Sequence, residues 1–317
     1  MGRTQSWALA APAELAPAFA ADANRWRRDL AWDTHELWAA IERARVDGRL
    51  DGLVSLDDAG AVAGWTYFVA RGGDLHCGAL EAADAATTAG LADALLATPA
   101  AGGAERVLLF VYSAAPGLEA VLRQRAFDLV PYDYRVSPLA VGTRVAAPGR
   151  AWDLRDLDAT AATLHAAYPG ADPRRPFAPH GTLAEWRQYA CDLVMGQGCG
   201  RFRPTLSIAV PGAGGRLEAV ALVTDLGHGT AHLAQIAVAP SRRGGGLGRA
   251  MLAAITAQCA AAGFARLSLL VERGNRPATA LYDQARFDVR ATFLCAVRPG
   301  ARAALLGVPA ASAARGR

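Results

Sequence analysis

The same order of secondary-structure signals occurs twice in this chain of 317 residues, at a constant offset along the sequence. The apolar runs 105–112 and 265–272 have the length and composition of buried strands. Each run is followed by a helix-like stretch, a phenylalanine (Phe127 or Phe287) and a further strand-like run. Such an internal repeat restricts the fold to two copies of one α/β unit.

Identity between the copies is low, since only a minority of positions agree between 107–128 and 267–288. The segments that begin at Trp7 and Trp152 both predict a short strand, an acidic turn and a helix. Between the copies, 141–150 has the Gly, Pro and Ala content of a linker. We therefore expect two domains and a tail, with the bounds 1–143, 150–305 and 306–317.

Lysine is absent from the chain, so every basic side chain apart from histidine is arginine. This excludes P-loop, Schiff-base and kinase-type chemistry, each of which needs a lysine. The net charge of +4 and a pI near 9.0 leave nucleic-acid binding open, although the abundance of arginine and alanine is typical of a GC-rich genome and weakens that signal. Five cysteines without a C-x-x-C pair favour buried thiols over disulfides or a metal site. No segment is typical of a signal peptide or a membrane span, so we expect a cytoplasmic protein.

The segment 231–252, AHLAQIAVAPSRRGGGLGRAML, predicts a strand, a glycine-rich loop and the start of a helix. Free backbone amides and the helix dipole at such a junction bind phosphate oxygens, and glycine allows close approach. Three arginines at this positive helix end (Arg242, Arg243 and Arg249) are unfavourable unless an anion binds there. A glycine-rich turn with solvated arginines remains the alternative.

The loop reads R-x-x-G-x-G from Arg243 to Gly248, after the strand IAVAP, and fits neither a Walker A loop nor a dinucleotide fingerprint. It resembles the acetyl-CoA loop of the GNAT superfamily, the GCN5-related N-acetyltransferases. The later stretch LLVERGNRPATALYDQARFDV is similar to that family's strand, Asn, helix, Leu-Tyr and Gly-Phe sequence, except that Arg286 replaces the glycine. The resemblance covers 150–300 and implies two tandem GNAT-like domains of the α/β (α+β) class. Each domain would have a mixed, mostly antiparallel sheet flanked by helices.

The resemblance assigns the cofactor residues in the second copy. Backbone groups of two strand residues would bind the pantetheine arm of acetyl-CoA, where the strand separates from its neighbour. The loop would hold the pyrophosphate, and an asparagine would contact the pantetheine or shape its channel; a turn asparagine is the alternative. The residues so assigned are Ile236, Val238, Arg243, Gly244, Gly246, Gly248, Arg249 and Asn275.

Tyr282 is the candidate catalytic acid, because the equivalent family tyrosine protonates the departing CoA thiolate, and a core tyrosine is the alternative. His232 is the candidate general base, against the alternative of a half-exposed strand histidine. Carboxylates that could serve instead are Asp225, Glu218 and Glu272. In the first copy Leu122 stands at the position of Tyr282 and Ala115 at that of Asn275, and the R-x-x-G-x-G loop is missing. We therefore expect the first copy to have lost the cofactor site.

The resemblance implies that the acceptor contacts the stretch 164–189, where Arg174 and Arg175 could bind an anionic group such as a carboxylate; a solvated Pro-rich loop is the alternative. The residues concerned are His165, Tyr168, Arg174, Arg175, Phe177, His180 and Trp186. The expected reaction is direct transfer of an acetyl group from acetyl-CoA to a primary amine of a small molecule or peptide, without a metal, nucleic-acid or membrane partner. The open alternatives are a mycothiol-synthase-like acetyltransferase and a non-catalytic acyl-CoA-binding module. The sequence leaves the acceptor, the acyl chain and the oligomeric state undetermined.

Overall fold

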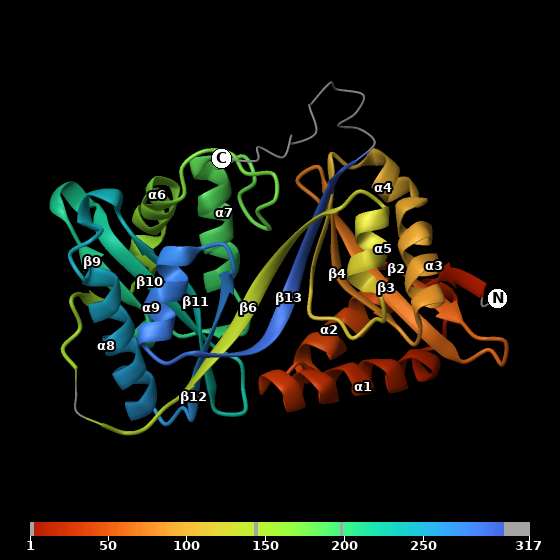
Figure 1. The fold of residues 1–317 in the computed structure, drawn as a ribbon, viewed down its shortest axis with the longest axis horizontal. Coiled ribbons are helices and arrows are strands. Elements are labelled where there is room, and N and C mark those ends of the chain that lie inside the picture. The colour runs from red at the N-terminus through yellow and green to blue at the C-terminus, as the bar shows by residue number, and fades with distance from the viewer. Residues whose placement is uncertain (1–2, 143–144, 197–198, 301–317) are drawn as a thin grey trace. The chain divides into compact units, whose positions relative to one another are not determined.

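The computed structural model describes residues 3–142, 145–196 and 199–300, so the predicted tail 306–317 lies outside the described residues. The chain divides into two compact units (Figure 1). Unit 1 contains residues 1–26, 34–131 and 292–317, and unit 2 contains 27–33 and 132–291. Each unit therefore combines segments that lie far apart in the sequence.

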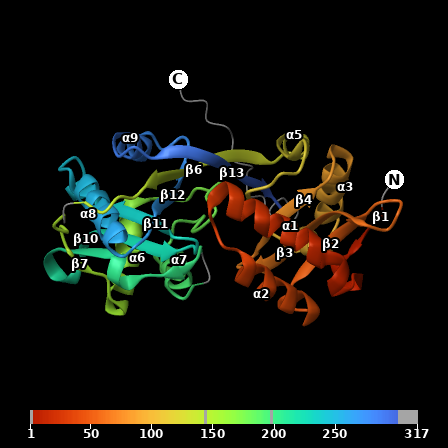
Figure 2. The same cartoon turned by 90° about the horizontal axis from the view of Figure 1, so that it is seen from below.

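Unit 1 has a mixed sheet in which β2 to β4 are antiparallel and β4 and β5 are parallel. The end of β13 (Asp288–Pro299) closes the sheet beside β5. Helices α3, α4 and α5 share an apolar core with one face, and α1 and α2 pack in a second core. Figure 2 shows α3 and α5 on one side of these strands and α1 and α2 on the other. The elements that begin in unit 1 are β1 (Arg3–Ser6), α1 (Pro12–Leu30), α2 (His35–Val46), β2 (Asp51–Leu56), β3 (Val62–Arg71), β4 (Asp74–Ala82), α3 (Ala85–Leu96), α4 (Pro99–Gly103), β5 (Arg106–Val111), α5 (Leu118–Gln124) and β6 (Asp128–Pro138).

Unit 2 repeats this topology. Its strands β9 to β11 are antiparallel, β11 and β12 are parallel, and the end of β6 closes the sheet beside β12. Helices α8 and α9 share one core, and α6 and α7 share the other (Figure 1). The elements that begin in unit 2 are β7 (Arg150–Ala151), α6 (Leu157–Ala167), α7 (Leu183–Val194), β8 (Arg201–Phe202), β9 (Ile208–Pro211), β10 (Leu217–Asp225), β11 (Thr230–Val238), α8 (Leu247–Ala261), β12 (Arg266–Glu272), α9 (Arg276–Gln284) and β13 (Asp288–Pro299).

The predicted repeat is present in the order of elements. One and the same offset separates the starts of β5 and β12, the ends of α5 and α9, and the starts of β6 and β13. The expected division between 143 and 150 follows the linker-like composition. The units of the structure instead change within β6 and again within β13, because the last strand of each copy pairs in the other unit. Composition reveals a linker but not which strand pairs with which.

A β-bulge marks the same place in both sheets. On β4 the extra residue is Gly78, and on β11 it is Ala234. The parallel ladder between β4 and β5 ends at Cys77, and that between β11 and β12 ends at Leu233, each one residue before the bulge. Bulges bend a strand and interrupt its pairing. Beyond this point β11 has left β12, as the family resemblance predicts for the pantetheine-binding strand.

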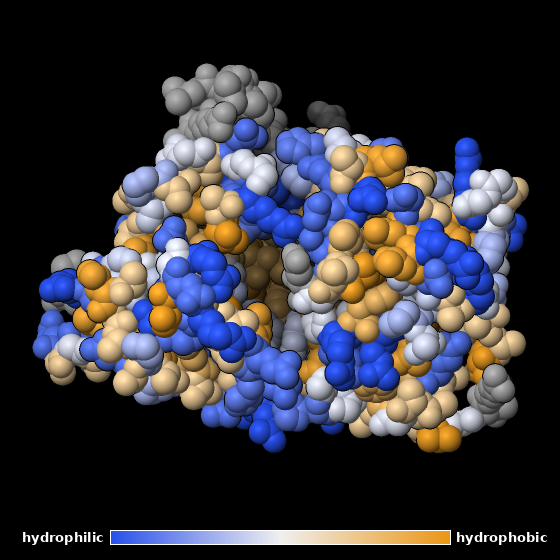
Figure 3. Space-filling view, turned by 180° about the vertical axis from the view of Figure 1, so that it is seen from behind, coloured by the Kyte–Doolittle hydropathy of each residue, from blue (hydrophilic) through white to orange (hydrophobic). Residues whose placement is uncertain are grey.

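No helix among the described residues is long and apolar enough to cross a membrane. Exposed large hydrophobic side chains such as Leu9, Leu154 and Met195 come from different elements. Hydrophilic and hydrophobic residues are interspersed on the face that Figure 3 shows.

Candidate functional site

The open edge of β11 is the centre of the candidate site. Residues 234–236 and Val238 of this strand are only partly buried, whereas the paired part from Thr230 to Leu233 is buried. The carbonyl of Ile236 accepts a hydrogen bond from the Tyr168 hydroxyl at 3.4 Å, and the carbonyl of Val238 accepts one from Arg243 Nε at 3.2 Å. Ile236 and Val238, whose backbone groups are predicted to bind pantetheine, thus both accept hydrogen bonds from polar side chains at this edge.

The glycine-rich loop follows directly and leads into α8. Gly244 and Gly246 have φ angles of +80° and +78°, a backbone conformation that glycine adopts without strain. Gly246 is the N-cap of α8, and no side chain caps this helix. Within the described residues, no amide from Gly244 to Arg249 donates to another backbone group. A row of free amides at a helix N-terminus is a site for an anion.

The three arginines at this loop differ in their contacts. Arg243 Nη2 donates to the carbonyl of Ala167 at the end of α6, at 2.7 Å, so Arg243 fastens the loop to α6 and to the end of β11. Arg242 forms an ion pair with Glu218 at 3.0 Å. Arg249 donates to Gln284 of α9 at 3.1 Å. Arg243 is therefore the arginine that joins the loop to the open strand edge.

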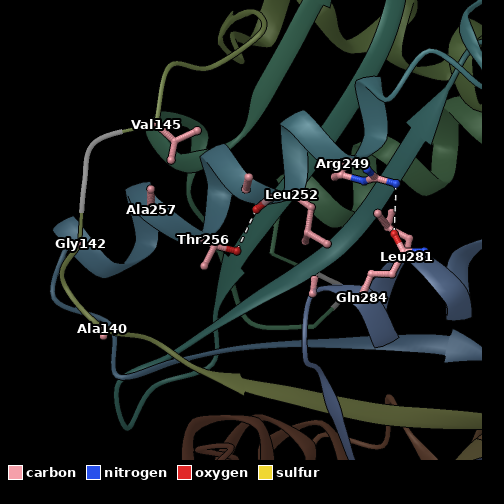
Figure 4. A pocket seen from close by; sticks show the side chains of 11 residues that line it. Ala140, Gly142, Val145, Arg249, Leu252, Thr256, Ala257, Leu281 and Gln284 are labelled. Atoms are coloured by element: carbon pink, nitrogen blue, oxygen red, sulfur yellow. Dashed lines mark hydrogen bonds between the residues drawn. The ribbon is translucent and has the colours of Figure 1, made fainter.

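Arg249 also lines a pocket of about 560 Å³ beside α8 (Figure 4). The walls are the outer side of α8, including Leu252 and Thr256, the end of α9 at Gln284, and Ala140 from the segment that follows β6. Neither Tyr282 nor the open residues of β11 line it. The pocket is next to the loop but separate from the strand opening.

Tyr282 lies on α9 and is 5% exposed, with its ring centre 5.9 Å from that of Phe287. Burial raises the pKa of Tyr282, the nearby hydroxyl of Tyr168 raises it further, and Arg135 lowers it. The hydroxyl therefore keeps its proton at neutral pH. Since Tyr168 also contacts Ile236, the structure brings Tyr282 close to the open edge of β11.

Asn275 is the N-cap of α9, because its side chain accepts a hydrogen bond from the amide of Ala278 at 3.3 Å. This cap fixes the start of the helix that carries Tyr282. The alternative, that Asn275 is a turn asparagine after a strand, agrees with this capping contact.

His232 is 2% exposed, so the expectation of a half-exposed strand histidine is wrong. Its Nδ1 lies 2.9 Å from the Ser268 hydroxyl, and its ring lies against Trp32 and Tyr134. Burial lowers its pKa to about 3, so the imidazole is neutral. His232 lies on the paired part of β11, before the strand leaves β12. Sequence alternation does not reveal that 27–33 covers this face.

The three carboxylates that could replace His232 have different surroundings. Glu218 is paired with Arg242, and Asp225 is paired with Arg201 and Arg203. Glu272, at the end of β12, is half-buried, and no hydrogen bond or ion pair of its side chain occurs within the described residues.

Three features of the site were not predicted from sequence. The Tyr189 hydroxyl donates a hydrogen bond to Gln235, and Gln235 donates one to the Tyr168 hydroxyl. Arg243 donates to the carbonyl of Ala167. These contacts depend on the bulge at Ala234 and on the docking of α6 and α7, which leave no pattern in the sequence.

Comparison with known proteins agrees with this geometry. Residues 166–287 match the model of the acetyltransferase (GNAT) family, and the match includes β11, the glycine loop, α8 and α9, which is less than half of the chain. No curated protein sequence matches the chain.

Solved structures show the fold of both units. A GNAT-family acetyltransferase of Colwellia psychrerythraea has a TM-score of 0.55 at 13% identity, over 93% of this chain and 99% of that one. A GCN5-related N-acetyltransferase of Sphaerobacter thermophilus has a TM-score of 0.52 at 15% identity, over 78% and 80%. A fungal multi-domain β-N-acetylglucosaminidase with a GCN5-related glucosamine N-acetyltransferase region has a TM-score of 0.61 at 13% identity, over 94% of this chain and 38% of that one. At these identities the likeness shows the fold alone.

Proposed function

Because residues 166–287 form a domain of the GNAT acetyltransferase family, we propose that unit 2 transfers an acetyl group from acetyl-CoA directly to a primary amine. The observation that carries the proposal is the uncapped N-terminus of α8 beside the open edge of β11. The residues present fit acetyl-CoA. The amides from Gly244 to Arg249 suit a pyrophosphate, and the edge at Ile236 and Val238 suits the amide groups of pantetheine.

Two side chains would move protons in this reaction. The amine attacks the thioester carbon, the resulting tetrahedral intermediate collapses, and the carbon–sulfur bond breaks. We assign Tyr282 as the donor to the departing thiolate, because burial keeps its hydroxyl protonated and it lies near the open edge.

The acceptor of the amine proton would be Glu272 rather than His232. A neutral imidazole with a pKa near 3, already in contact with Ser268, is a weak base. Side chains alternate along a strand, so Glu272 lies on the same side of β12 as Ser268. It pairs in register with Tyr132 of β6.

Release of free thiol from acetyl-CoA in the presence of amines tests the reaction. Tyr282→Phe should lower kcat about 100-fold, in the range of a lost general acid, with the Kd of acetyl-CoA unchanged. Glu272→Gln should lower kcat at neutral pH by roughly the same factor, because the amine then lacks its proton acceptor. Leu154→Ala, an exposed position of unit 2, is the control. Unchanged turnover in Tyr282→Phe would remove the acid assignment, and unchanged turnover in Glu272→Gln would remove the base assignment.

A non-catalytic acyl-CoA-binding module remains the second candidate, since the loop and edge serve binding alone equally well. It predicts acetyl-CoA binding without thiol release on any amine. The mycothiol-synthase-like activity predicts release with a cysteinyl amine on a sugar.

A further inference from the structure

A buried group of charged side chains lies between β6 and α9 in unit 2. Arg135 of β6 is 5% exposed, and its Nη1 donates a hydrogen bond to the carboxylate of Asp283 on α9. Its Nη2 lies 3.7 Å from a carboxylate oxygen of Asp133, which is itself 5% exposed. Asp133 also accepts two hydrogen bonds from Arg273, at 2.7 and 3.0 Å. These four residues are the ionic cluster of unit 2.

The matching position on the strand of unit 1 carries no charge. Arg135 pairs in register with Leu269 of β12. The counterpart of Leu269 at the repeat offset is Leu109 of β5, which pairs with Ala296. Ala296 is 0% exposed and belongs to the apolar core, so the fold forms without an arginine at this place. Burial of a charge costs free energy that ion pairs often offset only in part. Arg135 therefore indicates a role beyond folding.

The ionic cluster lies beside the candidate acid. Tyr282 directly precedes Asp283 on α9. Burial raises the pKa of Tyr282 and the Tyr168 hydroxyl raises it further, whereas the charge of Arg135 lowers it. No hydrogen bond of the Tyr282 hydroxyl occurs within the described residues. Unit 1 lacks both the arginine and the tyrosine, since Leu122 stands in place of Tyr282. The two side chains thus occur together in the unit that has the open strand edge.

The charges of the cluster are arranged so that Arg135 acts on Tyr282. Two cations and two carboxylates give the cluster a net charge of zero. Asp133 and Asp283 both lie at the Nη groups of Arg135, and its buried Nε has no hydrogen-bond partner in the described part of the chain. The Arg273 side chain is 54% exposed, so solvent screens its charge. Arg135 is therefore the buried cation of the cluster and has one unused donor.

We propose that Arg135 is a positioning residue that stabilises the tyrosinate formed by Tyr282 when the carbon–sulfur bond of the intermediate breaks. This role rests on the proposed function, which assigns Tyr282 as the acid. The electron pair of the broken bond goes to sulfur, the proton of the Tyr282 hydroxyl moves to that sulfur, and the phenol oxygen is left with the negative charge until solvent protonates it again. A buried cation stabilises this charge strongly, because the protein interior screens it weakly.

The origin of Arg135 gives the first copy a part in the reaction. β6 is the last strand of the first copy in sequence, yet it pairs with β12 of the second copy in unit 2. The first copy lacks the glycine loop and the tyrosine, but it supplies the strand that carries Arg135. The site of unit 2 is then completed by a residue that precedes the linker-like segment 141–150.

A double-mutant cycle tests whether Arg135 acts through Tyr282. Arg135→Gln should lower kcat about tenfold and leave the Kd of acetyl-CoA unchanged, because the acid becomes weaker. In a Tyr282→Phe background the same substitution should change kcat by less than about twofold. Arg135→Lys keeps the charge and should retain kcat within about threefold. Arg106→Gln is the matched control and should leave kcat unchanged, since it breaks a similarly buried arginine–aspartate pair in unit 1.

Replacement of Tyr282 by 3-nitrotyrosine gives a readout that needs neither turnover nor acetyl-CoA. The nitro group makes the phenol more acidic and coloured, so absorbance follows its ionisation. Arg135→Gln should raise the pKa of this phenol by about 1. Asp283→Asn should lower it, because one carboxylate leaves the cluster. The Asp283 side chain is 59% exposed, so this variant keeps the test decisive where Arg135→Gln does not fold.

The outcomes separate the two proposals. A raised pKa in Arg135→Gln or a lowered pKa in Asp283→Asn supports the role of Arg135 even where no thiol is released, and the transfer reaction alone then fails. An unchanged pKa in both variants overturns that role. It is also overturned by an equal loss of kcat in both backgrounds, or by a loss in Arg106→Gln or Arg135→Lys as large as that in Arg135→Gln. Failure of the wild type to bind acetyl-CoA overturns the proposed function.

Discussion

Units 1 and 2 have the same topology and the same bulge, but the helix that follows the bulged strand is capped by a side chain in unit 1 and not in unit 2. In unit 1 two residues connect β4 to α3, and Asp84 caps that helix by accepting from the amide of Thr87 at 2.7 Å. In unit 2 eight residues connect β11 to α8, and Gly246 leaves the helix uncapped. The carboxylate of Asp84 occupies the place that an anion would take.

The burial of the residues that follow the bulge differs as well. Leu80 stands two residues beyond the bulge of β4, as Ile236 does on β11. Leu80 is 0% exposed, and its carbonyl accepts a hydrogen bond from Ser113 at 2.5 Å. Glu81 accepts from Arg25 at 2.8 Å and from the amide of Ala114 at 3.2 Å. Beyond the bulge Leu80 of unit 1 is therefore fully buried, whereas residues 234–236 of unit 2 are only partly buried.

The comparison separates fold from site. The bulge and the divergence of the parallel strands occur in both units, so they are properties of the shared topology. The long glycine loop, the free amides and the partly exposed strand residues 234–236 occur in unit 2 and are absent at the corresponding described positions of unit 1. These three features are what the proposed cofactor site adds to the fold.

The largest expected effect comes from giving unit 2 the cap of unit 1. Gly246→Asp should place a carboxylate at the first turn of α8 and raise the Kd of acetyl-CoA at least 100-fold, because several charge-assisted hydrogen bonds are lost and the anions repel. Gly246→Asn, which has the same shape without the charge and meets the same positive φ, should raise it less than tenfold. Equilibrium titration measures both. Similar affinities in the two variants would contradict the role of the amides.

A smaller effect concerns the stability contributed by Glu81, which follows the bulge of β4 in unit 1. Burial raises the pKa of Glu81 from its ordinary value of 4.5 to about 7, and Arg25 acts against this rise. The folded state then binds the proton more tightly than the unfolded chain. The stability from this group is present below about pH 4.5 and is lost as the pH rises through about 7.

Glu81→Gln should therefore be more stable than the wild type above pH 7, by up to roughly 3 kcal/mol, and should lose this advantage toward pH 4.5. Thermal unfolding between these pH values measures the difference. Glu119→Gln, an exposed position of α5, is the control. The corresponding position of unit 2 is Ala237, which has no ionisable side chain. A stability gain of Glu81→Gln that does not grow with pH would contradict the role of Glu81.

The sequence predicted those parts of the fold that depend on local pattern. The apolar run 265–272 forms β12, and Gly244 and Gly246 mark the loop because a positive φ favours glycine there. Alternation of side chains shows which faces are buried but not which strand lies next to which, so the pairing of β6 with β12 was not predictable. The burial of His232 depends on Trp32, which lies far away in the sequence. Contacts of this kind are set by tertiary packing.

Counting bound acetyl-CoA molecules tests the central claim most directly, which is that unit 2 alone provides the cofactor site. Calorimetric titration of the full chain should give one acetyl-CoA per chain, and Gly246→Asp should remove that binding. Two molecules per chain, or binding that Gly246→Asp leaves unchanged, would contradict the account.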